Sequence, residues 1–273
     1  MALIEDTLFG RINKVDVAIQ RIKAFDPIAN GWADEPYYVA YSGGKDSDVL
    51  RILFQLAGVK HDLVHNHTTA DAPETVRYVR SIPDIQISYP DTTMWKLIVK
   101  KLGPPTRVFR YCCSEFKEKG GGGRIVSTGV RWSESPRRAS TRALAEIQHR
   151  DISKNLMLNS DNDEARRLFE TCQIKGRKVI NPIIDWSDED VWELLGAERC
   201  PSNPLYQCGF KRVGCIGCPM ATPKIVEMGF ALHPKYKQAY VAAFDRMIIA
   251  RHERDMPTKW QSGEEVLAWQ HRR

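Results

Sequence analysis

The segment Ser42–Ser47 has the sequence Ser-Gly-Gly-Lys-Asp-Ser, and it constrains the fold more than any other part of the chain. An apolar, β-prone stretch at 37–41 precedes it, and the apolar spacing of 48–56 after it predicts a buried helix. A strand, a glycine turn and a helix N-terminus together present backbone N–H groups at the positive end of a helix, which favours phosphate. The two glycines let an anion approach the backbone, the lysine adds a positive charge, and the serines supply hydroxyl donors. The sequence therefore predicts a nucleotide-binding loop.

The spacing of this loop differs from the G-x-x-x-x-G-K-[ST] pattern of the P-loop kinases and GTPases. Strand-like and helix-like stretches alternate from 37 to 129. This order predicts an α/β fold with a doubly wound, mostly parallel sheet that helices cover on both faces. Ligands of such sheets bind beyond the carboxyl ends of the strands, where 42–47, 68–71 and 129–135 are expected to emerge.

Three segments are expected along the chain. Residues 1–30 would form an N-terminal helix, because apolar residues from Leu8 to Ile22 recur at steps of three and four. Residues 31–195 would form the nucleotide-binding domain. Residues 196–273 would form a helical C-terminal segment that carries a cysteine motif.

The composition fits a water-soluble globular protein rather than a membrane protein. No apolar run approaches the length that spans a bilayer, and the N-terminus lacks a secretory pattern, so we expect a cytoplasmic protein with no membrane partner. The formal net charge of +6 is compatible with nucleic acid or with anionic nucleotides. The sequence leaves the oligomeric state open.

Seven cysteines are unevenly placed, and an odd number in a chain of this kind argues against a disulfide framework. Cys215 and Cys218 are two residues apart in a glycine-rich segment, which is a metal-ligand spacing. Cys112 and Cys113 are adjacent about a hundred residues earlier, and Cys208 is the alternative ligand should only one of that pair bind. Four thiolates arranged in this way predict a 4Fe–4S cluster or a tetrahedral zinc site.

Further motifs make a resemblance specific. They are His67–Thr75 (His-Thr-Thr-Ala-Asp-Ala-Pro-Glu-Thr), Thr128–Ser135 (Thr-Gly-Val-Arg-Trp-Ser-Glu-Ser) and Asn181–Trp192 (Asn-Pro-Ile-Ile-Asp-Trp-Ser-Asp-Glu-Asp-Val-Trp). With the Ser-Gly-Gly-Lys-Asp-Ser loop and in this order, they resemble the phosphoadenosine phosphosulfate reductase family. That family is a branch of the adenine nucleotide α-hydrolase-like ATP pyrophosphatases, known as PP-loop enzymes. The resemblance covers roughly residues 35 to 220.

The resemblance implies an adenine-nucleotide site and cleavage of ATP to AMP and pyrophosphate. The residues that it assigns to ATP are Tyr41, Ser42, Gly43, Gly44, Lys45, Asp46, Ser47, Thr68 and Gly129. Arg131 and Arg138 would lie near the phosphates or their anionic partner and act in catalysis with Lys45 and Asp46. Asp46 would help to place Mg²⁺, although an acid at this position also suits the helix start. Ser187 and Asp190 have the spacing of a helix N-cap.

The paired cysteines followed by C-x-x-C are similar to those of the cluster-bearing adenylylsulfate reductases, whose ligands would correspond to Cys112, Cys113, Cys215 and Cys218. Those reductases also carry a nucleophilic cysteine near the C-terminus. This chain has no cysteine after Cys218, so reduction of adenylylsulfate or phosphoadenylylsulfate becomes the alternative function.

The ATP pyrophosphatase components of bacterial DNA phosphorothioation systems also resemble this chain, as do cluster-dependent tRNA thiolases. In both, ATP would adenylate an oxygen of the nucleic acid, and sulfur from a cysteine desulfurase would replace that oxygen with help from the cluster. DNA phosphorothioation is the preferred hypothesis. The sequence is also compatible with tRNA thiolation and with a non-enzymatic nucleotide sensor that binds ATP without releasing pyrophosphate.

Overall fold

The computed structural model describes residues 3–8, 10–32, 36–149, 151–159, 167 and 176–272. The chain divides into two compact units. The first unit comprises Met1–His65, Val79–Gln86 and Gly121–Asn203, and the second comprises Asn66–Tyr78, Ile87–Gly120 and Pro204–Arg273. No helix in the described part of the chain is long and apolar enough to cross a bilayer.

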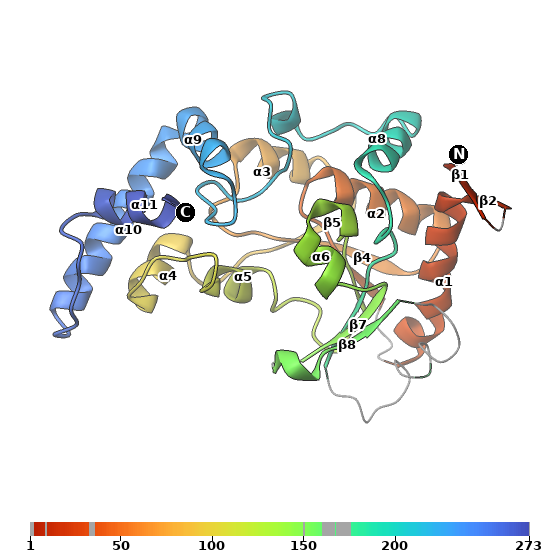
Figure 1. The fold of residues 1–273 in the computed structure, drawn as a ribbon, viewed down its shortest axis with the longest axis horizontal. Coiled ribbons are helices and arrows are strands. Elements are labelled where there is room, and N and C mark those ends of the chain that lie inside the picture. The colour runs from red at the N-terminus through yellow and green to blue at the C-terminus, as the bar shows by residue number, and fades with distance from the viewer. Residues whose placement is uncertain are drawn as a thin grey trace. The chain divides into compact units, whose positions relative to one another are not determined.

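A seven-stranded sheet with strand order β5-β4-β3-β6-β9-β7-β8 forms the framework of the first unit (Figure 1). Its strands are β3 (Tyr37–Ala40), β4 (His61–Asn66), β5 (Ile85–Ser88), β6 (Val126–Ser127), β7 (Ala145–Gln148), β8 (Leu156–Leu158) and β9 (Arg177–Ile180). The pairs β3–β4, β3–β6 and β6–β9 are parallel, whereas β7 runs antiparallel to β8 and β9. The predicted α/β class with a mostly parallel sheet is therefore confirmed.

Strand β3, an inner strand of the sheet, is apolar along its length because helices flank the sheet. Tyr37, Tyr38 and Val39 of β3 are all buried, as expected for a parallel strand that faces protein on both sides. The helices of the first unit are α1 (Lys14–Trp32), α2 (Lys45–Ala57), α6 (Pro136–Thr141) and α8 (Asp188–Ala197), and α3 (Pro73–Arg80) spans the division between the units. Helix α2 packs against both α1 and α8.

The N-terminal segment differs from the prediction. An antiparallel hairpin of β1 (Ile4–Thr7) and β2 (Gly10–Asn13) precedes the helix, so the helix begins at Lys14 and not near Leu8. Asn13 explains this start, because its side-chain oxygen accepts a hydrogen bond from the Val15 N–H at 3.2 Å and so caps the helix. The apolar spacing continued through the hairpin and concealed the boundary.

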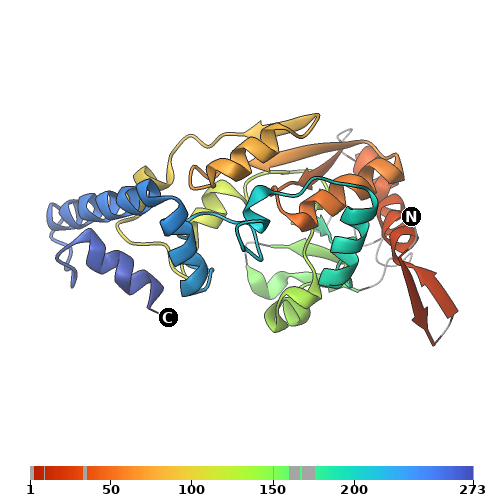
Figure 2. The ribbon, with the colours of Figure 1, turned by 90° about the horizontal axis from the view of Figure 1, so that it is seen from above.

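The second unit is mainly helical. Its helices are α4 (Met94–Lys101), α5 (Tyr111–Phe116), α9 (Pro223–Leu232), α10 (Pro234–His252) and α11 (Gly263–His271). Figure 2 shows α10 and α11 side by side, and α10 also packs against α4. Their shared core includes Leu97, Tyr240, Phe244 and Val266. The expected cysteine-bearing helical C-terminal segment is present, and it shares this unit with 66–78 and 87–120, which the sequence assigned to the nucleotide-binding domain.

Candidate functional site

The predicted loop joins β3 to α2 in the first unit. Gly43 has a φ of +75°, a conformation that favours glycine, and α2 begins at Lys45. The Ser47 hydroxyl donates to the Gly44 carbonyl at 2.7 Å and accepts from the Gly44 N–H at 3.1 Å. Asn203 donates its side-chain N–H to the Gly43 carbonyl at 2.9 Å, a contact that sequence reasoning missed. The loop is thus closed by Ser47, whose hydroxyl bonds to Gly44, and by Asn203 from a distant segment.

Two cations and two carboxylates meet beside this loop. Arg131 donates from Nε to Asp46 Oδ1 at 2.8 Å and from Nη2 to Asp188 Oδ1 at 2.5 Å. Lys45 Nζ lies 3.0 Å from the same oxygen of Asp188 and 3.4 Å from Asp46 Oδ1. Predicted site residues Lys45, Asp46 and Arg131 are therefore brought together, with Asp188 as an additional member that the sequence did not reveal.

Burial acts to raise the pKa of Asp188, but hydrogen bonds from Lys45 and Arg131 outweigh it, so this pKa lies below its usual value. The Arg131 side chain is only 1% exposed, and it also donates to the Ser133 hydroxyl and the Trp186 carbonyl. A buried guanidinium with this many partners is held in a fixed orientation.

Gly129 allows the turn that carries Arg131 to approach the loop. A Cβ atom at this position would lie 2.9 Å from the backbone oxygen of Asp46, closer than real Cβ contacts. Gly129, predicted as a nucleotide-binding residue, therefore has a steric role in the structure, since a side chain here would push the turn away from Asp46. Close approach of two backbones is a typical reason for glycine at a ligand loop.

Three other residues that were predicted to bind or act on the nucleotide have side-chain partners other than the two cations and two carboxylates beside the loop. Arg138 pairs with Glu134, and the same Glu134 oxygen accepts from the Arg131 N–H at 3.3 Å, so Arg138 is linked to Arg131 through a carboxylate. The buried Tyr41 donates its hydroxyl to Asp48 at 2.5 Å. Thr68 belongs to the second unit, where its hydroxyl lies 3.3 Å from the sulfur of Cys215.

The second unit gathers the four predicted metal ligands. Cys112 and Cys113 lie in the first turn of α5, and Cys215 and Cys218 lie in the loop before α9. The Cys112 pKa is raised, chiefly by its hydrogen bond to Cys113, then by burial and by the charges of Cys113, Cys215 and Cys218. The same hydrogen bond lowers the pKa of Cys113. Because the other three thiols all influence the pKa of Cys112, we treat Cys112, Cys113, Cys215 and Cys218 as one cluster, called the thiol cluster below.

The pKa of Cys215 is raised to about 11, chiefly by burial and also by the charges of Asp71 and Cys218, whereas the charge of Lys117 opposes the shift. Lys117 is exposed at the surface, yet the charge of Cys215 is the main influence that raises the Lys117 pKa. Lys117 lies one helical turn beyond Cys113, a signal that spacing alone could have given. Cys208, the alternative ligand, is exposed.

One aromatic side chain of α10 holds the C-x-x-C loop, and a second holds the segment around Asp71 to which that loop is hydrogen-bonded. Tyr240 donates its hydroxyl to the Ile216 carbonyl at 3.0 Å, and Tyr236 donates to the Asp71 carbonyl at 2.8 Å. Gly217, between the two cysteines, has a φ of +67°, and a Cβ there would lie 2.6 Å from the Tyr240 ring. This loop shape therefore needs glycine at its centre.

The donor set fits a metal centre. Soft thiolates select zinc or iron–sulfur clusters, and a bound cation would stabilise the ionised form of the thiols. The four cysteines are free thiols in the structure. They are the residues that would hold such a group.

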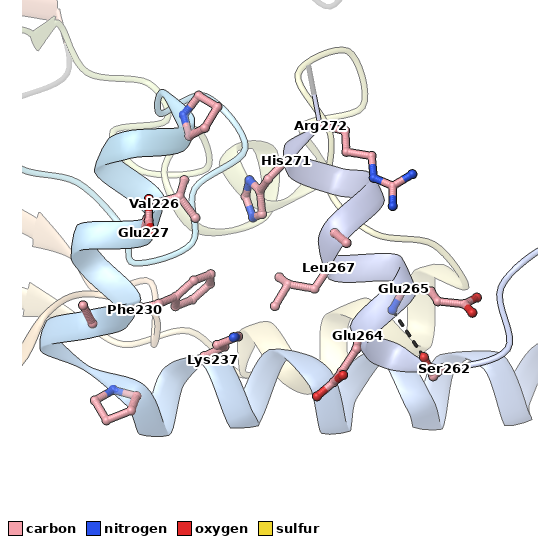
Figure 3. Close-up of a pocket in the computed structure, with 14 residues that line it drawn as sticks. Val226, Glu227, Phe230, Lys237, Ser262, Glu264, Glu265, Leu267, His271 and Arg272 are labelled. Carbon is pink, nitrogen blue, oxygen red and sulfur yellow. Dashed lines mark hydrogen bonds between the residues drawn. The ribbon is translucent and has the colours of Figure 1, made fainter.

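An open groove of about 890 Å³ lies among α9, α10 and α11 of the second unit. Phe230 of α9 and Leu267 of α11 point toward one another across it, and His271 lies near its end (Figure 3). None of its lining residues is among the predicted site residues. The groove is mainly apolar, and its lining includes neither the charged residues beside the loop nor the cysteines of the thiol cluster.

Known proteins are similar to this chain in sequence. The phosphoadenosine phosphosulfate reductase domain matches residues 36–221. An uncharacterised protein of Methanocaldococcus jannaschii is 27% identical over 250 residues, which cover 85% of this chain and 42% of that protein. Adenosine 5′-phosphosulfate reductase of Allochromatium vinosum is 41% identical over 46 residues, covering 17% of this chain and 18% of that enzyme. The chain thus spans less than half the length of these relatives.

Among solved structures, the phosphoadenylyl-sulfate reductase of Candida auris, in a phosphate complex, has a TM-score of 0.44 and 19% identity. The similarity covers 74% of this chain and 93% of that one. An FMN adenylyltransferase of Candida glabrata, in complex with FMN and an ATP analogue, has a TM-score of 0.42, 16% identity and coverage of 74% and 64%.

Proposed function

Since the chain belongs to the phosphoadenosine phosphosulfate reductase domain family, we propose that it is an ATP pyrophosphatase that activates a nucleic acid for sulfur insertion. The preferred reaction is DNA phosphorothioation. The observation that carries the proposal is the combination, in one chain, of Lys45 and Arg131 beside a glycine loop with a cluster of four thiols.

Lys45 and Arg131 would bind the β and γ phosphates of ATP, together with backbone N–H groups of the loop. An acceptor oxygen attacks the α-phosphorus, the bond to the bridging oxygen breaks, and pyrophosphate leaves with the electron pair. The two cations stabilise the charge that develops on this leaving group. Asp46, whose carboxylate lies 2.8 Å from Arg131 Nε, is the residue that would hold Mg²⁺, which would neutralise phosphate charge when bound.

The adenylated oxygen then leaves as part of AMP when sulfur at the sulfide level attacks the acceptor phosphorus. A cysteine desulfurase is the class of partner that would supply this sulfur as a persulfide, and a thiol reductant would supply the two electrons that release it as sulfide. The thiol cluster would hold a 4Fe–4S centre, which when bound would supply redox or sulfur-handling chemistry; zinc is the alternative occupant. The residues of this chain that hold the cysteines in position are Tyr240 and Gly217.

An exposed turn just before α5 supports a nucleic-acid acceptor. Phe109 is 62% exposed and Val108 is 91% exposed, with Arg107 and Arg110 on either side. Thr106 closes this turn, since its hydroxyl accepts the Phe109 N–H at 2.9 Å. A fixed aromatic ring between arginines suits stacking of an unpaired base and contact with phosphates.

Reduction of adenylylsulfate or phosphoadenylylsulfate is the second candidate function. The short but more similar matches to adenosine 5′-phosphosulfate reductases favour it, among them 50% identity over 44 residues to the enzyme of Neisseria meningitidis serogroup B. That reaction would release sulfite with a thiol reductant, whereas the preferred reaction would not.

Anaerobic purification followed by an iron count and a visible spectrum is the first part of the test. The second part measures pyrophosphate release from ATP with single-stranded DNA, duplex DNA and tRNA, at several salt concentrations. The proposal expects iron in the protein and release that nucleic acid stimulates and salt suppresses. Sulfite formation from either sulfate nucleotide, with no pyrophosphate release, would favour the reductase. ATP binding without product would favour a nucleotide sensor.

A further inference from the structure

Asp188 is the first residue of α8, and its side chain contacts two cations and takes no part in the helix cap. The caps at the start of α8 come from its neighbours, because Ser187 and Asp190 satisfy each other's backbone N–H groups. Asp188 is not needed for that cap, and its side chain instead contacts Lys45 and Arg131. Its side chain is 62% exposed, whereas those of Lys45 and Arg131 are 7% and 1% exposed. The carboxylate therefore covers two buried cations from the solvent side.

The charges of these four groups balance. Lys45 and Arg131 contribute two positive charges, and Asp46 and Asp188 contribute two negative ones. Buried cations without such partners would be costly, so the carboxylates stabilise the loop when no anion is bound. A polyphosphate arriving here would add negative charge to a site that is already neutral. One carboxylate must then give up its place.

The two carboxylates differ in how firmly they are held. Asp46 follows Lys45 in the first turn of α2, and its backbone is packed against Gly129. Asp188 is joined to the cations by its side chain alone and lies on the exposed side. A rotation of one side chain frees it into water, whereas displacement of Asp46 would require the loop to move. Asp188 is therefore the group that leaves.

We infer that Asp188 is an internal counter-ion that occupies the phosphate position between Lys45 and Arg131 and is exchanged for the polyphosphate of the nucleotide. This inference rests on the proposed binding of ATP at the loop. It makes Asp188 a residue that selects among anions. Pyrophosphate and ATP offer several charged oxygens to replace its two contacts, whereas a single phosphate group offers fewer and competes poorly.

The test compares binding of inorganic pyrophosphate, ATP and AMP by calorimetry, each with and without Mg²⁺, in the full chain and in Asp188→Asn. The variant keeps the shape of the side chain and removes its charge. Binding of pyrophosphate should tighten on the order of tenfold, the size expected when a charge-assisted hydrogen bond no longer has to be broken. Selectivity for pyrophosphate over AMP should fall. Glu189→Gln is the matched control, because Glu189 is exposed in the same helical turn and should leave affinity unchanged.

Unchanged or weaker pyrophosphate binding in Asp188→Asn would overturn the inference. Loss of ATP binding only in the presence of Mg²⁺ would also overturn it, because Asp188 would then be a metal ligand. Thermal melting identifies a variant that has lost its fold, and Asp188→Ser provides a second substitution for that case. If the unsubstituted protein binds neither ATP nor pyrophosphate, the proposed function and this inference fail together. Binding by that protein with no gain in either variant defeats the inference alone.

Discussion

The two units differ in how charge is balanced at their candidate sites. In the first unit, Lys45 and Arg131 are buried beside the loop, and Asp46 and Asp188 neutralise them within the chain. In the second unit, the hydrogen bond with Cys113 and burial raise the pKa of Cys112, burial raises the pKa of Cys215, and the charge of Lys117 opposes the rise for Cys215. The four charged groups at the loop thus neutralise one another without a ligand, whereas a bound cation would stabilise the ionised thiols of the thiol cluster. Substitutions in each unit should affect one site without affecting the other.

The largest effect is expected at the loop. Lys45→Ala should lower ATP cleavage by about 10²–10³-fold, because it removes one of the two cations that we propose to face the leaving phosphates. The iron content should stay unchanged, since the thiol cluster belongs to the other unit. Pyrophosphate release and iron are measured on the same preparation, with Lys100→Ala, an exposed lysine of α4, as the control. Equal activity in Lys45→Ala and the control would remove the loop from the chemistry.

Cys218→Ser tests the thiol cluster of the second unit. Loss of one of four thiolates should abolish the visible absorption of a cluster and reduce bound iron severalfold, while ATP still binds at the loop. Cys208→Ser should retain the cluster, because Cys208 is exposed and outside the predicted ligand set. Iron analysis and visible spectroscopy check both variants. A cluster that survives in Cys218→Ser but is lost in Cys208→Ser would require a different set of ligands.

Gly217→Ala probes how far the thiol cluster depends on its loop. The new Cβ would lie 2.6 Å from Tyr240 at a φ of +67°, so unfolding free energy should fall by roughly 1–3 kcal/mol. Gly214→Ala, three residues earlier, meets no atom within 4 Å and should change stability by less than about 0.5 kcal/mol. Denaturant melts of the metal-free proteins make the comparison. Equal stability of the two variants would mean that the loop adapts to a side chain.

The smallest effect concerns pH and the groove of the second unit. Burial, aided by the charge of Arg107, lowers the pKa of His271 from 6.5 to about 4. The unfolded chain then binds the proton more readily, so this contribution to stability is complete above about pH 6.5 and is lost as pH falls toward 4. As the pH falls through that window, the melting temperature of His271→Gln should fall less than that of the unsubstituted protein. Parallel pH curves for the two proteins would show that His271 is free to protonate in the fold.

The local part of the first unit was predictable because its signals are local. The strand, the two glycines and Lys45 are consecutive, so their geometry follows from short-range rules. Asp188 was hidden because it comes from a helix start far along the chain, where the spacing of Ser187 and Asp190 indicated only a cap. Asn203 was hidden for a related reason, since it contacts the loop through a side chain from a distant segment.

The thiol cluster was predictable as a set because cysteine spacing carries its own chemical meaning. Its surroundings were not, since Thr68 is one βα step after the loop in sequence and was assigned to nucleotide, yet its hydroxyl contacts Cys215. The start of α1 was missed because a three- and four-residue apolar spacing also passed through the β1–β2 hairpin. In each case the sequence identified the residue types, and tertiary contacts decided their partners.

Cleavage of ATP between its α and β phosphates is tested most directly by phosphorus NMR of the reaction products. The anaerobically purified protein is incubated with ATP, Mg²⁺ and the nucleic acid that stimulates it most. AMP and pyrophosphate in equal amounts are the predicted products, and Lys45→Ala should form both about 10²–10³-fold more slowly. Formation of ADP and inorganic phosphate would contradict the assignment, because that pattern belongs to enzymes that transfer the γ-phosphoryl group.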